Sequence, residues 1–96
     1  MSEPFTIDSI VFLPDESGEY VEFSGEIHPF TVIVFHDCVG PEQRVVWYWR
    51  IQAQGARLWR SGGYYIKAQR AAENALATLR QELGFVLRQI RSMESV

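Results

Sequence analysis

The chain has 96 residues, 47% of them apolar and 22% charged, a composition that excludes a disordered chain, a collagen and a disulfide scaffold. Its length favours one domain over residues 1–96, and its single cysteine, Cys38, excludes an internal disulfide. The net charge is −3, no apolar run approaches the ~18 residues of a membrane span, and residues 1–4 do not start a signal peptide. We therefore expect a cytoplasmic protein that does not enter a membrane.

The first 43 residues predict short strands joined by turns. Residues 10–14 and 20–23 are β-type runs separated by a turn-forming segment, so we expect a hairpin. Residues 24–25, a serine and a glycine, predict a break in the chain. Residues 30–36 are β-branched or aromatic and predict a longer strand, which is followed by a loop.

The segment 45–54 alternates with a period of two, which predicts a half-buried strand with its tryptophans on the apolar face. A turn at Gln54 and Gly55 leads to a partner strand over residues 56–60. The side chains expected on the outer face of this hairpin are Tyr48, Arg50, Gln52, Arg57 and Trp59.

From about residue 67 to residue 92 the apolar period changes to 3.6, which predicts one helix. Its apolar stripe comprises Ala68, Ala72, Ala75, Leu76, Leu79, Leu83, Val86, Leu87 and Ile90. A helix of about 25 residues is ~37 Å long and overhangs a sheet of short strands. Because residues 85–90 are still apolar there, a second copy of the chain is the simplest partner to cover them.

Strands followed by one long helix predict an α+β fold, with an antiparallel sheet of four or five strands and the C-terminal helix packed on one face. We expect this protein to be a homodimer. The predicted core comprises Val32, Val34, Trp47, Trp49, Ile51, Leu58, Leu76, Leu79 and Leu83.

Charge is sharply divided along the chain. Residues 1–43 are acidic and β-rich, with nine acids and no base (−9); residues 44–96, the hairpin and helix, carry nine bases and three acids (+6). Eight of the nine bases are arginines, which favour planar contacts with carboxylate or phosphate. The halves can neutralise each other within the fold or across a dimer, the basic half can bind a polyanion, or the acidic half a basic partner.

Residues 47–61 form an aromatic-rich strand, a glycine turn and a second strand ending in Ser61. The pattern continues through Tyr64 and Lys67 into an alanine-containing helix. It resembles the repeat unit of the small YegP-like proteins, a family of unknown function. The resemblance implies an α+β unit that completes its sheet with a second unit.

The same segment resembles, more distantly, the arm-type DNA-binding domain of phage integrases. In that domain a three-stranded sheet and a lysine before an alanine-rich helix form the core. The resemblance implies a sheet face that meets DNA, which here would be formed by Tyr48, Arg50, Arg57 and Trp59. Neither resemblance carries a catalytic motif.

Two surfaces are candidates for binding. The outer hairpin face interleaves arginines with aromatics, which suits a protein interface as well as base stacking and phosphate contact. Its candidate residues are Tyr48, Arg50, Arg57, Trp59 and Arg60. An acidic face can imitate a phosphate backbone, and its residues are Asp15, Glu16, Glu19, Glu22 and Glu26. Alternatively, the N-terminal half or the helix covers the hairpin face, and its arginines pair with acids of the N-terminal half.

Catalytic and metal sites are not expected. His36 and Cys38 are good metal ligands, but zinc needs four, and His28 is the only other soft candidate. A Cys–His pair on one strand also lacks a third, orienting group. The chain has no glycine-rich phosphate loop and no nucleophile motif, so we expect neither enzyme activity nor a cofactor.

We therefore expect a non-enzymatic interaction module that binds a protein partner through the hairpin face. The alternatives are a nucleic-acid-binding domain that uses the same arginines, and an acidic inhibitor or DNA mimic of phage type. Nucleic-acid binding predicts steep salt dependence, whereas a DNA mimic has no affinity for nucleic acid.

Overall fold

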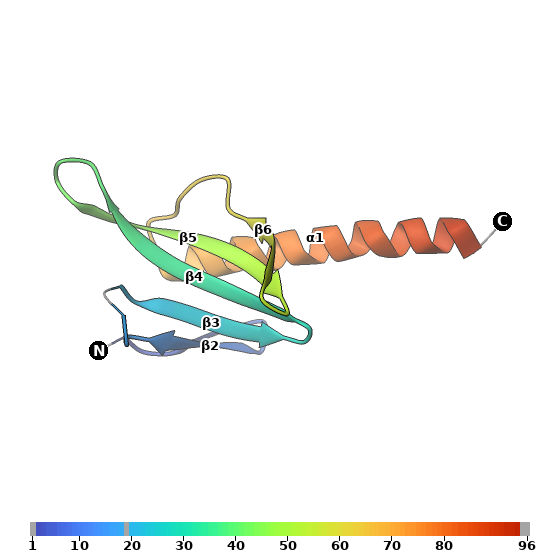
Figure 1. Ribbon diagram of the computed structural model, residues 1–96, viewed down its shortest axis with the longest axis horizontal. Helices are drawn as coiled ribbons and strands as arrows, with labels where there is room; N and C mark the ends of the chain where they lie inside the picture. The colour runs from blue at the N-terminus through green and yellow to red at the C-terminus, as the bar shows by residue number, and fades with distance from the viewer. Residues whose placement is uncertain (1, 19, 95–96) are drawn as a thin grey trace.

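The computed structural model describes residues 2–18 and 20–94, in which six strands precede one helix (Figure 1). The elements are β1 (Phe5–Ile7), β2 (Ile10–Asp15), β3 (Glu22–Ile27), β4 (Phe30–Val39), β5 (Arg44–Ala53), β6 (Ala56–Arg60) and α1 (Ala68–Glu94). Each strand pairs with the next in antiparallel fashion, and the sheet order is the chain order. The α+β class is confirmed, but the sheet has six strands rather than four or five.

The strand that the sequence prediction missed is β1. It has three residues and joins β2 through Asp8 and Ser9, whose φ angles are 51° and 68°. Two consecutive positive φ angles are those of a type I′ turn, whose twist suits a two-residue hairpin. Such turns are usually marked by Asn-Gly or Asp-Gly, so Asp-Ser gave no clear hairpin signal.

The predicted chain break at Ser24 and Gly25 is wrong, because both residues lie inside β3. Gly25 pairs with Val32 of β4 and is buried. A Cβ atom at Gly25 would lie only 2.9 Å from the Cε1 atom of Phe12, a fully buried ring of the neighbouring strand. This glycine therefore makes room for the aromatic core instead of ending a strand.

Helix α1 covers one face of the sheet with its first half, and its small alanines allow the helix to lie close to β4 and β5. The indole Nε1–H of Trp49 donates a hydrogen bond to Oδ1 of Asn74 at 3.0 Å, which ties β5 to the helix. The residues buried in this core include Phe12, Phe23, Val32, Val34, Trp49, Ile51, Ala72, Ala75, Leu76 and Leu79.

The predicted core is confirmed except at one position. Trp47 and Leu83 are partly buried and pack against the core, whereas Leu58 is 44% exposed.

The second half of α1 projects beyond the end of the sheet (Figure 1), so the molecule is elongated, with extents of 57 × 26 × 23 Å. Among the described residues no helix is apolar enough over a sufficient length to cross a membrane.

Candidate binding face

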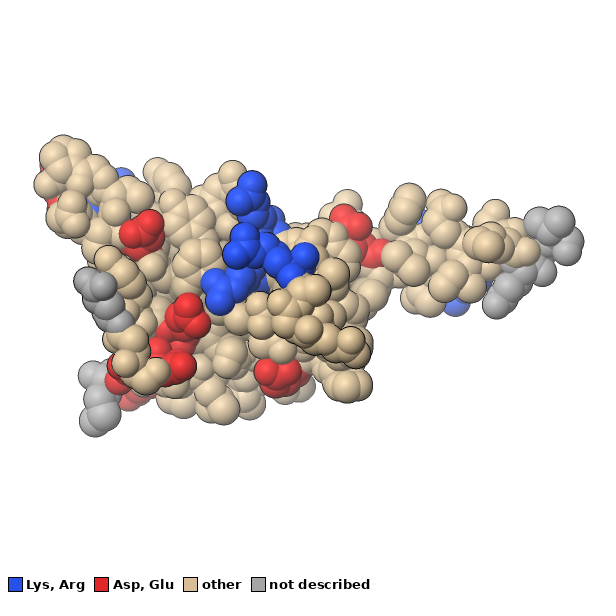
Figure 2. Space-filling view, in the orientation of Figure 1, with Lys and Arg blue, Asp and Glu red and all other residues tan. Residues whose placement is uncertain are grey.

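The sheet face opposite α1 is here called the open face, because α1 is the only helix among the described residues and covers the other side. Its centre is formed by Ile33, Phe35, Tyr48, Arg50, Arg57 and Arg60. Figure 2 views this face and shows basic side chains gathered at its centre, with acidic side chains around them. The N-terminal half therefore extends the sheet and does not cover the hairpin.

Strand β5 alternates as predicted from Trp47 onward but not at its start, where Val46, on the side of Tyr48, is fully buried and Val45 is 46% exposed. Trp49 and Ile51 are buried in the core under α1, whereas Tyr48 and Arg50 lie on the open face. The same period applies to β4, where Val32 and Val34 belong to the core. This period places Ile33 and Phe35 on the open face, a placement that the sequence analysis missed although the alternation of β4 carried the signal.

Strand β6 does not alternate simply, because it contains a β-bulge. Gln52 of β5 pairs with Arg57, but the preceding residue, Ile51, pairs with Trp59. Leu58 is therefore an extra residue in β6. One extra residue exchanges the two faces for the rest of a strand, so Arg57 and Trp59 point to opposite sides of the sheet.

The prediction that Trp59 lies on the outer face is therefore wrong. Its ring packs against the core and lies 6.3 Å from the ring of Phe30, measured between centroids. The bulge brings Arg60 to the open face instead, directly opposite Arg50. Of the five residues predicted to form the binding surface of the hairpin, the structure thus gathers four on the open face: Tyr48, Arg50, Arg57 and Arg60.

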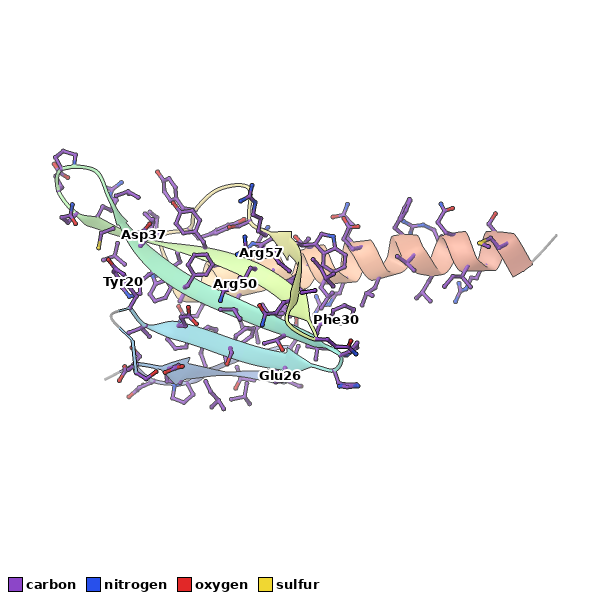
Figure 3. All side chains as sticks on the ribbon, viewed as in Figure 1. Tyr20, Glu26, Phe30, Asp37, Arg50 and Arg57 are labelled. Carbon is purple, nitrogen blue, oxygen red and sulfur yellow. The ribbon has the colours of Figure 1, made fainter. Side chains whose placement is uncertain are left out.

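The centre of the open face is a stack of aromatic and guanidinium groups. Of this region, Figure 3 labels Arg50 and Arg57. The rings of Phe35 and Tyr48 lie opposite each other on β4 and β5, with centroids 5.7 Å apart and planes 22° apart. The Cζ atom of Arg50 lies 5.1 Å from the centroid of Phe35, within the range of a cation–π contact. Nη2 of Arg50 is 3.9 Å from Oε1 of Glu22, which makes a loose ion pair. These contacts hold the Arg50 side chain over the sheet.

A hollow of about 430 Å³ opens beside this stack. It is lined by Phe35, Asp37, Tyr48, Trp49, Arg50, Arg57, Arg60, Ser61 and Gly62. Three guanidinium groups from β5 and β6 therefore border one hollow. Their planar donors suit a carboxylate or a phosphate group.

Positive charge in this arginine cluster is poorly balanced. Arg50 and Arg60 are direct cross-strand neighbours, and like charges in that position are destabilising. Within the described part of the chain, Glu22 is the only acid within 4.0 Å of any of the three guanidinium groups. At the open face the acids of the N-terminal half thus neutralise only part of the positive charge of the C-terminal half.

Two of the predicted acidic residues lie together: Asp15 of β2 pairs directly with Glu22 of β3, and both line one shallow hollow at this end of the sheet. Glu22 faces Arg50, and Oε2 of Glu26 accepts a hydrogen bond from the Thr31 hydroxyl at 2.9 Å. Glu19 lies outside the described residues. The acids of β3 thus contact their own sheet, Glu26 on the neighbouring strand β4 and Glu22 across β4 on β5.

Asp15 and Glu16 are held by local hydrogen bonds near the turn after β2. Oδ1 of Asp15 accepts hydrogen bonds from the Ser17 hydroxyl at 2.6 Å and the Ser17 amide at 2.9 Å, and these lower the pKa of Asp15. The amide of Ser2 donates to Oε1 of Glu16 and lowers the pKa of that carboxyl. Both carboxylates therefore have structural contacts at the end of the sheet.

His36 has a structural environment. Its Nε2 accepts a hydrogen bond from the Val21 amide at 3.0 Å, and its ring lies 5.0 Å from that of Trp47. Oδ1 of Asp37 accepts a hydrogen bond from the amide of Cys38, whose thiol is free. The described residues contain no group of three or more His, Cys, Asp or Glu side chains that could hold a metal ion.

In comparisons with known proteins, no protein-family model, curated protein or solved structure matches the chain. The resemblances to the YegP-like proteins and to the integrase arm-type domain therefore stay predictions.

Proposed function

We propose that this protein is a non-enzymatic interaction module that binds a protein partner through the open face. We further propose that the partner presents carboxylate side chains to Arg50, Arg57 and Arg60. The observation that carries this proposal is the arginine cluster, in which three guanidinium groups surround one hollow. Among the described residues the only ion pair of this cluster is the loose one between Arg50 and Glu22, at 3.9 Å.

The energetic case rests on charge. A carboxylate in the hollow relieves the repulsion between Arg50 and Arg60, and planar guanidinium groups bind carboxylates in a bidentate manner. Arg50 already rests on Phe35, so less side-chain entropy is lost when it binds. Arginine and tyrosine are also common anchors of protein interfaces, and Tyr48 lies beside the cluster.

The surroundings favour a protein over a nucleic acid. Glu22 lies 3.9 Å from Arg50 and Asp37 lines the same hollow as the arginines, and Figure 2 shows acidic side chains around the basic ones on this face. A phosphate backbone is negative along its whole length and would be repelled by these carboxylates. A protein surface can match both signs of charge, which is the usual source of specificity at interfaces.

Binding of short acidic peptides provides the test. Fluorescence anisotropy is measured with labelled peptides rich in Asp and Glu, with versions in which these become Asn and Gln, and with a labelled DNA duplex. We expect binding of the acidic peptides only, and a rise in Kd of at least about tenfold in the double variant Arg57→Ala, Arg60→Ala. Arg91→Ala, which removes an exposed arginine of α1, is the matched control and leaves Kd unchanged.

The other outcomes are equally informative. Duplex binding that falls steeply between about 50 and 200 mM salt would overturn the proposal in favour of a nucleic-acid-binding domain. Failure of every acidic peptide, or equal loss in the Arg91→Ala control, would also overturn it. An acidic inhibitor would instead bind a basic partner and lose that binding on neutralisation of Glu22 and Glu26.

A further inference from the structure

Helix α1 carries an apolar repeat that continues beyond the sheet. Its apolar positions follow alternating spacings of four and three residues, at Ala72, Leu76, Leu79, Leu83, Val86, Ile90 and Met93. This is the a/d pattern of a heptad repeat, the period at which one helix packs against another. We call these seven residues the heptad seam.

The sheet covers only the first part of the heptad seam. Ala72, Leu76 and Leu79 are buried in the core, and Leu83 is partly buried at its edge. Beyond Leu83 the helix has left the sheet, and Figure 1 shows this projecting segment, residues 84–94, without any neighbouring element. The exposed fractions there are 47% for Val86, 45% for Ile90 and 76% for Met93.

The uncovered part of the seam is flanked by one more apolar residue and is free of charge. Leu87, which is 53% exposed, lies beside the seam at the heptad e position. Arg88 and Arg91 occupy the f and b positions, on the outer side of the helix. The uncovered seam is therefore an apolar stripe that suits another apolar helix of the same period, while Phe85, 53% exposed, lies outside it at the c position.

The uncovered part of the seam supplies a large share of the apolar area of a dimer interface. Val86, Leu87, Ile90 and Met93 are 45–76% exposed. With the remainder of Leu83 they offer at most roughly 300 Å² of apolar surface, since burying one such side chain removes about 60–120 Å² from water. A standard interface buries about 800 Å² per partner, about 60% of it apolar. The seam therefore provides up to about two thirds of that apolar area.

We propose that a second copy of this chain covers the projecting segment, with the two helices antiparallel. In this arrangement Leu83 lies opposite Met93 of the second copy, Val86 lies opposite Ile90, and Leu87 contacts its own equivalent near the twofold axis. Phe30 marks the end of the sheet from which α1 projects (Figure 3). In this arrangement the tip of each helix reaches that end of the other sheet. A parallel pair would place the two sheets side by side and align the helix dipoles unfavourably. This contact is separate from the open face and does not depend on the proposed function.

Sedimentation of the full-length protein tests the second copy. We expect a dimer at micromolar concentration, and a rise of at least about 100-fold in the dimer Kd for Val86→Glu, because a charge is buried without a partner. Gln81→Glu adds the same charge at an exposed position on the opposite side of α1 and leaves Kd unchanged. Both substitutions lie outside the core, so near-UV circular dichroism should show the native fold in each. A monomeric wild type, or equal dissociation of both variants, would overturn the proposal.

Cysteine crosslinking in a Cys38→Ser background tests the orientation. In the antiparallel pair Leu87→Cys brings two thiols within disulfide range, whereas Met93→Cys places them about 15 Å apart along the helix axis. We therefore expect covalent dimers from Leu87→Cys alone under mild oxidation. Crosslinking of Met93→Cys alone would overturn the antiparallel arrangement, since it is the result of a parallel pair.

Discussion

Arg50 and Arg60 lie directly opposite each other on β5 and β6, so two guanidinium groups share one cross-strand position on the open face. This pairing arises from the bulge at Leu58, without which Arg60 would point to the side of α1. Like charges in direct opposition weaken a sheet, and here the cost falls beside a hollow that can admit an anion. Several measurable consequences follow from this arrangement and from the packing around it.

Replacement of Arg60 should make the isolated protein more stable. Arg60→Glu turns a repulsive pair with Arg50 into an attractive one, and we expect the free energy of unfolding to rise by about 0.5–1 kcal/mol. Arg57→Glu is the control, because Arg57 lies opposite the neutral Gln52. Urea denaturation of both variants measures the difference. A lower stability of Arg60→Glu would show that the two arginines do not repel each other in the folded protein.

Truncation of Trp59 should destabilise the protein more than truncation of Leu58. Trp59 packs with Phe30 against the core, so Trp59→Ala should lower the free energy of unfolding by about 2–3 kcal/mol, somewhat less than for a fully buried tryptophan. Leu58 is 44% exposed at the bulge, and Leu58→Ala should cost less than about 1 kcal/mol. Chemical denaturation distinguishes the two. Equal losses would contradict the bulge and restore simple alternation in β6.

Gly25 should not tolerate even alanine. The new Cβ atom would meet the ring of Phe12 at 2.9 Å, and Gly25→Ala should therefore cost about 1–3 kcal/mol through overpacking. The smaller side chain of Phe12→Leu should recover part of that loss in the double variant. A double-mutant cycle measures the coupling. Strict additivity of the two substitutions would mean that the residues are not in contact.

Acid should destabilise the turn that contains Asp15. Hydrogen bonds from Ser17 hold the pKa of Asp15 below its ordinary value of 3.8 in the folded protein. A carboxyl whose folded pKa is depressed contributes stability above the unfolded pKa, and this is lost as the pH falls below about 3.8 and through the lower folded pKa. Ser17→Ala removes the hydroxyl donor, so the pKa of Asp15 should rise in an NMR titration. An unchanged titration curve would show that the hydroxyl contact is absent in solution.

The alternation within 45–54 determined from the sequence that Trp47, Trp49 and Ile51 of β5 face the core, because side chains of a strand alternate as long as no residue is inserted. It did not determine that Val46, on the other side, is fully buried as well. The turn at Gln54 and Gly55 was equally clear, and both residues adopt the positive φ angles of a hairpin turn. The apolar stripe of α1 was visible for the same reason, since a helix repeats its contacts every three or four residues. These features depend on local geometry alone.

Only the tertiary structure decided the composition of the open face. The bulge at Leu58 shifts the pairing of β6 by one residue, and the sequence does not show which residue is extra, because that depends on the packing of Trp59 into the core. The close approach of Phe12 to Gly25 joins two strands and is likewise invisible along the chain. The sequence by itself determined the periods of the elements and their charges. The tertiary structure decided which of those charges meet, because register and face across strands are set by contacts between residues far apart in the chain.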